Sequence, residues 1–217
     1  MIQLYYYPGN ANLAPHMLLE ELGIPYELVL VDTEKGAQHD PQYMKLNPCG
    51  RIPVLVDGDL VLFESAAICL YLADAYPDAG LAPSLGTVQR AHMYKWLMYL
   101  TNTLQTELIS YFYSDRLAND AAAAAQVKER AEQRVSGMLD MLEAELKENA
   151  EQLRGVYLLG PQYSVVDPYL LMLCRWTRAM RKPAKARPYL ATYLAQVFSR
   201  PAVSRAFEME GLQAPFY

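Results

Sequence analysis

The stretch Asn47-Pro48-Cys49-Gly50-Arg51-Ile52-Pro53-Val54-Leu55-Val56 decides how this chain is interpreted. Pro53 has no backbone N–H, so it cannot donate to a sheet ladder directly before the apolar residues 54–56. This arrangement favours an edge strand or a special turn, and a cis Ile52–Pro53 bond is one form of such a turn. A cis bond would leave the N–H and C=O groups of Ile52 pointing outward, where an extended peptide can pair with them.

Glu64 and Ser65 stand where the strand pattern of residues 60–63 gives way to the helical pattern of residues 66–75. The first N–H groups of a helix lack intrahelical partners and carry positive potential, which favours a carboxylate. The alternative is a plain helix cap, with Ser65 as the N-cap and Glu64 in solvent. A backbone clamp and an anion pocket together suit a small anionic peptide.

The composition excludes some classes of function. With 19 basic and 24 acidic residues among 217, the net charge of −5 argues against general nucleic-acid binding, which needs a basic face. The most apolar later stretch, residues 156–174, contains two prolines and Asp167, so no membrane span is expected. Three cysteines and no signal segment in residues 1–8 indicate a cytoplasmic protein.

Hydrophobic periodicity divides the chain into an α/β part and an all-α part. The first part reads as β-α-β followed by β-β-α, with strands at 2–7, 26–31, 54–56 and 60–63 and helices at 13–22 and 66–75. This order predicts a thioredoxin-like domain over residues 1–79, with its first two strands parallel. Glycine and proline mark a linker at 80–87. Residues 88–217 predict a helical bundle with helices at 88–114, 121–149, 166–180, 187–198 and 202–209.

These patterns resemble the cytosolic glutathione transferases over nearly the whole chain. The resemblance also includes the opening residues 4–8 (LYYYP), residues 164–167 (SVVD), residues 200–203 (RPAV) and residues 210–212 (EGL). The opening is similar to bacterial beta-like members, and residues 35–38 (KGAQ) are similar to the nu-like group.

The resemblance implies a glutathione site around the two motifs. Ile52, beside Pro53, would pair its backbone with the cysteinyl part of glutathione. Glu64 and Ser65 would hold the γ-glutamyl amine and carboxylate. Gln38 and Arg51 would reach the glycyl carboxylate as a neutral donor and a cation, although loop residues of these types are often only solvated. No metal is expected.

The residue that activates the thiol is left open by the sequence. Beta-like members carry a cysteine in the register held here by Ala11, and none of the three cysteines lies there, so a mixed disulfide at that position is excluded. Asn12, or a backbone N–H at the helix start, can donate to a thiolate, but Asn12 is equally suited as an N-cap. Tyr6 is a phenol donor ranked close to Asn12, and Asn10 is a third candidate.

The second substrate would lie between the two halves, where Tyr111, Phe112, Tyr113 and Trp176 are candidate wall residues. His16 and Asp167 are expected to serve packing and folding rather than catalysis. The main hypothesis is a homodimeric transferase that directs the glutathione thiolate at small apolar electrophiles. A glutathione-dependent disulfide reductase or peroxidase, and a non-catalytic interaction protein of the same fold, are the alternatives.

Overall fold

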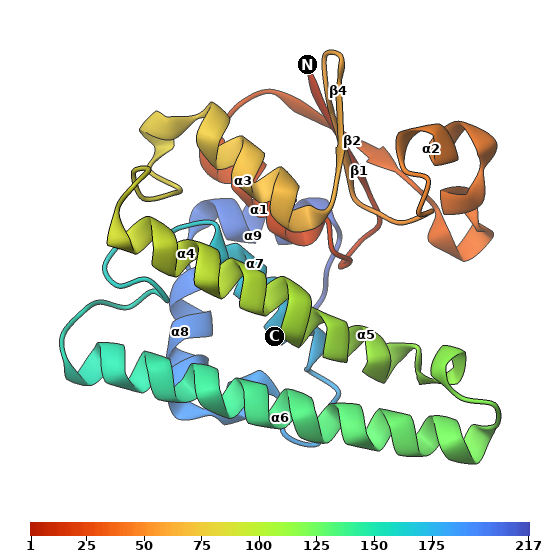
Figure 1. The fold of residues 1–217 in the computed structure, drawn as a ribbon. Helices are drawn as coiled ribbons and strands as arrows, with labels where there is room; N and C mark the ends of the chain where they lie inside the picture. The colour runs from red at the N-terminus through yellow and green to blue at the C-terminus, as the bar shows by residue number, and fades with distance from the viewer.

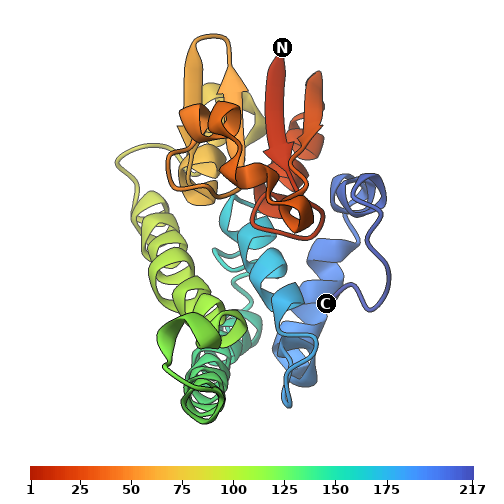
Figure 2. The ribbon, with the colours of Figure 1, turned by 90° about the vertical axis from the view of Figure 1, so that its right-hand side faces the viewer.

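A four-stranded sheet forms the N-terminal part of the structure, a computed structural model that describes residues 1–217. The strands, in the order β2-β1-β3-β4, are β1 (Ile2–Tyr6), β2 (Tyr26–Leu30), β3 (Val54–Asp57) and β4 (Leu60–Phe63). β1 and β2 run parallel, as expected from the helix between them, and the other two pairs are antiparallel. Figures 1 and 2 show this sheet as one layer set above a layer of helices.

Alternation along β1 assigns the helices to the two faces of the sheet. Ile2 and Leu4 are buried in the main core with residues of α1 (Leu13–Leu22) and α3 (Ser65–Ala75). Tyr5 points to the other face, where its ring lies 5.9 Å from that of Tyr43 on α2 (Pro41–Leu46). Two short 3-10 turns, η1 (Thr33–Lys35) and η2 (Ala37–His39), lead into α2. The thioredoxin-like order is therefore confirmed.

The turn before β3 is a special one, but β3 is an inner strand and not an edge strand. Ile52–Pro53 is a cis peptide bond. Val54 is the first residue of β3 to pair, with Tyr5 on one side and Phe63 on the other. Pro53 thus stands just outside the ladder, where its missing N–H costs the sheet nothing.

Helices make up the remainder of the chain after η3 (Pro77–Ala79). The predicted helix over 88–114 is divided, because the π-helical segment η4 (Leu100–Gln105) separates α4 (Val88–Tyr99) from α5 (Thr106–Phe112). The other elements are η5 (Ser114–Leu117), α6 (Ala121–Glu151), α7 (Val166–Trp176), η6 (Ala184–Ala186), α8 (Pro188–Phe198) and α9 (Pro201–Met209). No helix is long and apolar enough to cross a membrane.

Asp167 near the start of α7 is a folding residue, as the sequence predicts. Its side chain is buried and accepts hydrogen bonds from the N–H groups of Leu158 and Ser164 and from the hydroxyls of Ser164 and Tyr193. Burial raises the pKa of this carboxyl group to about 6, against the opposing effect of those donors.

One end of the sheet faces the helical layer. Strand β1 ends there, β3 begins there and β4 ends there, because β1 and β3, and β3 and β4, are antiparallel. α1, which follows β1, packs against α3, α7 and α9. The loops at this end therefore lie between the sheet and the helical layer, as Figure 2 shows for the β1–α1 loop.

Candidate functional site

The start of α3 leaves several donors without partners. Ile68 donates the first helical hydrogen bond, to the carbonyl of Glu64, so the N–H groups of Ser65, Ala66 and Ala67 precede the helical ladder. Glu64 is exposed to solvent, has φ 74° and holds the N-cap position of α3. Ser65 is the first helical residue, so the expectation that Ser65 is the N-cap is wrong. The Ser65 hydroxyl has no partner in the chain, yet its oxygen keeps contact with solvent. This helix end can receive an anion.

The backbone of Ile52 is also unpaired. Neither its N–H nor its C=O takes part in a hydrogen bond within the chain. The preceding carbonyl, that of Arg51, is held from behind by the Tyr43 hydroxyl at 2.7 Å and by Asn47 Nδ2 at 2.7 Å. The turn is thus fixed at Arg51 and open at Ile52. Because Val54 pairs with Phe63 at the end of β4, this open backbone and the α3 start lie at the same end of the sheet.

Two further predicted residues meet at the side of this turn. An ideal Cβ on Gly50 would lie 3.3 Å from the backbone oxygen of Gln38, so η2 is in contact with the chain beside Arg51. Arg51 is exposed and pairs with no carboxylate. Gln38 is half-buried, and its Oε1 has no partner. The backbone of Gln38 therefore lies beside this turn, and the guanidinium of Arg51, the residue before Ile52, forms no ion pair.

Asn12, the first candidate for thiol activation, is tied up by the fold. Its residue is fully buried, its Nδ2 donates to Oε1 of Glu210 at 2.9 Å, and its Oδ1 accepts the N–H of Tyr7 at 3.2 Å. Its side chain caps no helical N–H either. A ligand sulfur would have to displace one of these partners, so this geometry speaks against Asn12 as a side-chain donor. Asn12 does hold the N-cap position of α1, as the alternative expected, but without a side-chain cap bond.

Other donors at the β1–α1 loop are free. The Tyr6 hydroxyl and the Asn10 side chain have no hydrogen-bond partner in the chain, and the N–H groups of Ala11 and Asn12 donate to no acceptor. Burial, with a contribution from the Glu210 charge, raises the pKa of Tyr6 above its usual 10, so this phenol keeps its proton at neutral pH. The Tyr6 hydroxyl, the Asn10 side chain and the N–H groups of Ala11 and Asn12 are therefore the unpaired donors at this loop.

His16 serves packing and hydrogen bonding, as expected. It is fully buried, with Nδ1 2.8 Å from Oε1 of Glu210 and Nε2 2.9 Å from the Tyr26 hydroxyl. With both ring nitrogens engaged inside the protein, it offers no group to a substrate.

An aromatic wall stands beside the β1–α1 loop. Trp176, at the end of α7, donates its Nε1–H to the carbonyl of Gly9 at 3.0 Å. The ring of Phe112 meets that of Trp176 edge to face at 6.4 Å, and both Phe112 and Tyr113 are exposed. Tyr111, which the sequence also suggests for this wall, is instead buried against α6, where Lys128 Nζ lies 4.8 Å from its ring. Tyr111 therefore packs toward α6, with its ring 5.2 Å from that of Phe112.

The cysteines lie outside this arrangement of donors. Cys69 and Cys174 are buried, and burial raises the pKa of both thiols, which makes them poor nucleophiles. Cys49 is exposed in the loop before Arg51 and is free. None of them is adjacent in sequence to Ala11.

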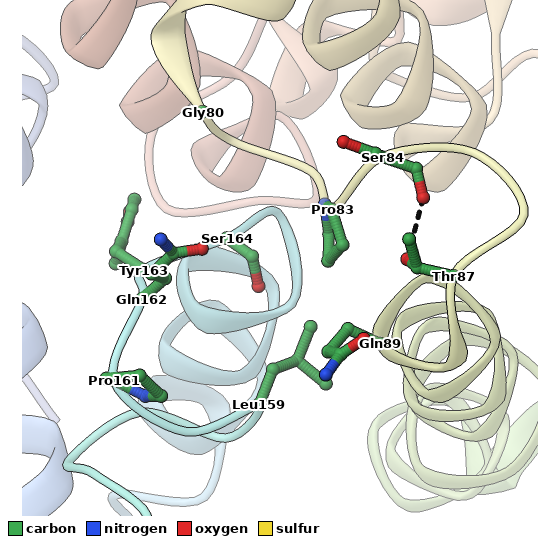
Figure 3. A pocket seen from close by; sticks show the side chains of 10 residues that line it. All are labelled: Gly80, Pro83, Ser84, Thr87, Gln89, Leu159, Pro161, Gln162, Tyr163 and Ser164. Atoms are coloured by element: carbon green, nitrogen blue, oxygen red, sulfur yellow. Dashed lines mark hydrogen bonds between the residues drawn. The ribbon is translucent and has the colours of Figure 1, made fainter.

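A hollow of about 340 Å³ elsewhere in the protein does not compete for this role. It lies between the segment joining the two layers and the chain before α7 (Figure 3). Two of its hydroxyl groups already serve the fold: Thr87 donates to the carbonyl of Ser84, and Ser164 donates to Asp167. No charged side chain lines it.

Sequence reasoning missed Glu210, which the structure places at the centre of the loop contacts. Its carboxylate, fully buried, also accepts the N–H of Gly9 at 2.7 Å. The motif at 210–212 contributed only to the resemblance, and no local pattern indicates that its glutamate meets residues about two hundred positions earlier.

Comparisons with known proteins agree with this geometry. Residues 1–74 match the family model "Glutathione S-transferase, N-terminal domain", and residues 125–196 match "Glutathione S-transferase, C-terminal domain". Glutathione S-transferase GstA of Escherichia coli O157:H7 is 28% identical over 98% of this chain and 100% of its own length.

Two solved structures are similar over nearly their full length. A glutathione transferase homolog from Sulfitobacter with bound glutathione has a TM-score of 0.87 at 29% identity, covering 98% of this chain and 99% of that one. A bacterial beta-class glutathione S-transferase from Sphingomonas chungbukensis has a TM-score of 0.82 at 31% identity, covering 97% and 100%.

Proposed function

Because the chain belongs to the glutathione S-transferase family, we propose that it binds glutathione as the thiolate and transfers it to small apolar electrophiles. The observation that carries this proposal is the pair of unsatisfied backbone sites at one end of the sheet, at Ile52 and at the start of α3. The site takes a peptide with a carboxylate at its head, and glutathione has that chemistry.

Glutathione would lie across this end of the sheet. The Ile52 N–H and C=O would pair with the cysteinyl residue in the manner of a short added strand. The α3 N–H groups and the Ser65 hydroxyl would receive the γ-glutamyl carboxylate, and Glu64 would meet the amine. Arg51 and Gln38 would hold the glycyl carboxylate at the other end.

The sulfur would then reach the end of β1. The Tyr6 hydroxyl and the Ala11 N–H would donate to it, with Asn10 as a further donor, and each such bond favours the thiolate over the thiol. In this proposal the side chain of Asn12 does not contact the sulfur and instead supports the loop that carries these donors. Each unit by which the thiol pKa falls corresponds to about 1.4 kcal/mol of preferential stabilisation.

The reaction is a nucleophilic substitution or addition at carbon. The thiol proton leaves to solvent, and the sulfur forms a bond to the electrophilic carbon. In a substitution a leaving group departs with the bonding electron pair; in an addition the π electron pair moves to the neighbouring atom, which takes a proton from solvent. The wall of Phe112, Tyr113 and Trp176 would hold the apolar body of the electrophile beside the loop. This chemistry suits the detoxification of reactive apolar compounds.

Calorimetric titration with glutathione tests the proposal. The wild-type protein should bind it, and Ser65→Ala should weaken binding at least severalfold, because a hydrogen bond to a charged group is lost. Ser84→Ala, which removes an exposed serine hydroxyl outside the site, is the matched control and should bind like the wild type. Absence of heat with the wild type at millimolar-range glutathione would end the proposal.

A homodimer is part of the proposal. Tyr94 and Met98 are exposed, four residues apart on α4, and form an apolar stripe on one side of that helix. Arg90, on the same side, bonds both the Tyr94 hydroxyl and Asp74 of α3, which orders this surface. Sedimentation equilibrium should give twice the chain mass of 24.5 kDa, and Met98→Glu should shift the equilibrium to the monomer.

The cytoplasm is the compartment we propose. All three cysteines are free thiols, and one of them, Cys49, is exposed. A reducing compartment preserves such a thiol.

A further inference from the structure

The loop that would present donors to the sulfur is held by a residue from the far end of the chain. Glu210 directly follows α9, and its carboxylate is buried under the β1–α1 loop. Oε2 accepts the N–H of Gly9 at 2.7 Å, and Oε1 accepts the Nδ2–H of Asn12 at 2.9 Å. The loop is thus bound on both sides of Ala11.

The carboxylate has a third contact inside the protein. His16 Nδ1 lies 2.8 Å from Oε1, and His16 Nε2 lies 2.9 Å from the Tyr26 hydroxyl. That hydroxyl donates in turn to Glu20. Glu210 is therefore joined to the loop by two N–H donors and to α1 by the ring of His16.

These contacts determine which groups of the loop remain available. The Gly9 N–H donates to Glu210, and the Gly9 C=O accepts from Trp176. The side-chain amide of Asn12 donates to Glu210 and accepts from the N–H of Tyr7. Gly9 has φ 71°, and a Cβ there would meet Leu212 Cδ2 at 3.3 Å, so the tail after Glu210 also confines it. The Ala11 N–H, between the two bound residues, is left free.

We propose that Glu210 is a positioning residue for the thiolate: it fixes the β1–α1 loop so that the Ala11 N–H and the adjacent Tyr6 hydroxyl converge on the sulfur. This inference rests on the proposed function, because it concerns the donors of that same site. Preorganised donors stabilise charge without a cost of reorientation, and a loop released from its two supports would lose that advantage.

Other contacts already join the same two elements without touching the loop. Arg200 holds Glu21 of α1 with two hydrogen bonds, and Arg205 of α9 pairs with Glu20 at 2.7 Å. Docking of α9 on α1 therefore has its own supports. Among these interface residues, Glu210 contacts the loop. An effect on loop positioning can therefore be distinguished from an effect on helix packing.

The test variant is Glu210→Gln. One acceptor oxygen cannot serve the Gly9 and Asn12 donors on two sides, and the new NH₂ group would face one of them. We expect the pKa of enzyme-bound glutathione, followed by the ultraviolet absorbance of the thiolate, to rise by about one unit or more. The kcat for chlorodinitrobenzene conjugation should fall about tenfold or more, while binding of S-methylglutathione changes by less than about threefold.

Arg205→Ala is the matched control, because it breaks a contact of the same interface away from the loop. It should leave the bound-thiol pKa unchanged. If Glu210→Gln retains the wild-type melting transition and the wild-type thiol pKa, or if Arg205→Ala shifts that pKa equally, the inference is overturned.

A second variant keeps the inference testable if Glu210→Gln fails to fold. Asn12→Ala removes only one of the two supports, and it should shift the bound-thiol pKa in the same direction by a smaller amount. An unchanged value in that variant would also overturn the inference. If the wild-type protein binds no S-methylglutathione, the proposed function itself fails, which distinguishes the two outcomes.

Discussion

Two helices begin at the same end of the sheet, and the protein uses their starts differently. The start of α3 is open: its first N–H groups and the Ser65 hydroxyl have no partners within the chain. The start of α1 is held: Gly9 and Asn12 before it are bonded to a buried carboxylate from the other end of the chain. The comparison indicates two uses of a helix start: one offers its own N–H groups to a ligand carboxylate, and the loop before the other is ordered from behind by a distant residue.

The open start of α3 gives the largest expected effect. Ser65→Asp places a carboxylate where the γ-glutamyl carboxylate would sit, so repulsion adds to the lost hydrogen bond. Glutathione affinity should fall about a hundredfold or more in calorimetry. Ser84→Asp is the matched control at an exposed serine. Retention of wild-type affinity by Ser65→Asp would show that the anion lies elsewhere.

Asp167 is a second buried carboxylate, and it can be compared with Glu210. Asp167 accepts four hydrogen bonds but has no cationic partner, and burial raises its pKa to about 6, above the usual 3.8. The folded state therefore binds the extra proton between these values, so the contribution of this group to stability falls as pH rises from about 4 to about 6. Above that window the contribution is constant.

Chemical denaturation across this range measures that contribution. The unfolding free energy of the wild type minus that of Asp167→Asn should decrease by about 2–3 kcal/mol between pH 4 and pH 6. A difference that stays constant with pH would show that the four donors keep the carboxylate ionised throughout.

The donors left free beside the held helix start give a smaller effect. Tyr6→Phe removes one hydroxyl, and we expect the bound-thiol pKa to rise by about one unit and kcat to fall about tenfold. Tyr7→Phe is the matched control on the next residue, whose hydroxyl lies near Glu34 of η1. Equal losses in the two variants would remove Tyr6 from the site.

The smallest effect belongs to the exposed end of the site. Arg51→Ala should weaken glutathione binding about two- to fivefold, and the loss should shrink at high salt, because an exposed charge pair is screened. Lys35→Ala removes a cation that already pairs with Asp32 at 2.7 Å, and it should have no effect. A salt-independent loss in Arg51→Ala would indicate packing rather than charge.

The features that can be predicted from the sequence are those determined by residues close together in the chain. The special turn at Pro53 and a helix that begins within one residue of the predicted start at 66 follow from proline, strand and helix patterns within a few residues. The inner position of β3 could not be inferred from Pro53, since a proline one residue before the ladder satisfies both an edge and an inner strand.

The remaining part depends on contacts over long sequence separations and on helix phase. Asn12 is suited by type to a thiolate, but Glu210, 198 residues later, already occupies its amide. Tyr111 is buried toward α6 while its neighbour Phe112 meets Trp176, and the π-helical segment η4 affects the rotation of α5 relative to α4 that decides between them. A prediction that extends a regular α-helix from residue 88 to residue 114 cannot anticipate this change in rotation.

A crystal structure of the complex with glutathione tests the central claim most directly. We predict the γ-glutamyl carboxylate on the N–H groups of Ser65 and Ala66, the cysteinyl backbone paired with Ile52, and the sulfur within hydrogen-bonding distance of the Ala11 N–H and the Tyr6 hydroxyl. Glutathione bound with its carboxylate away from the start of α3, or with its sulfur turned from the β1–α1 loop, would contradict the account.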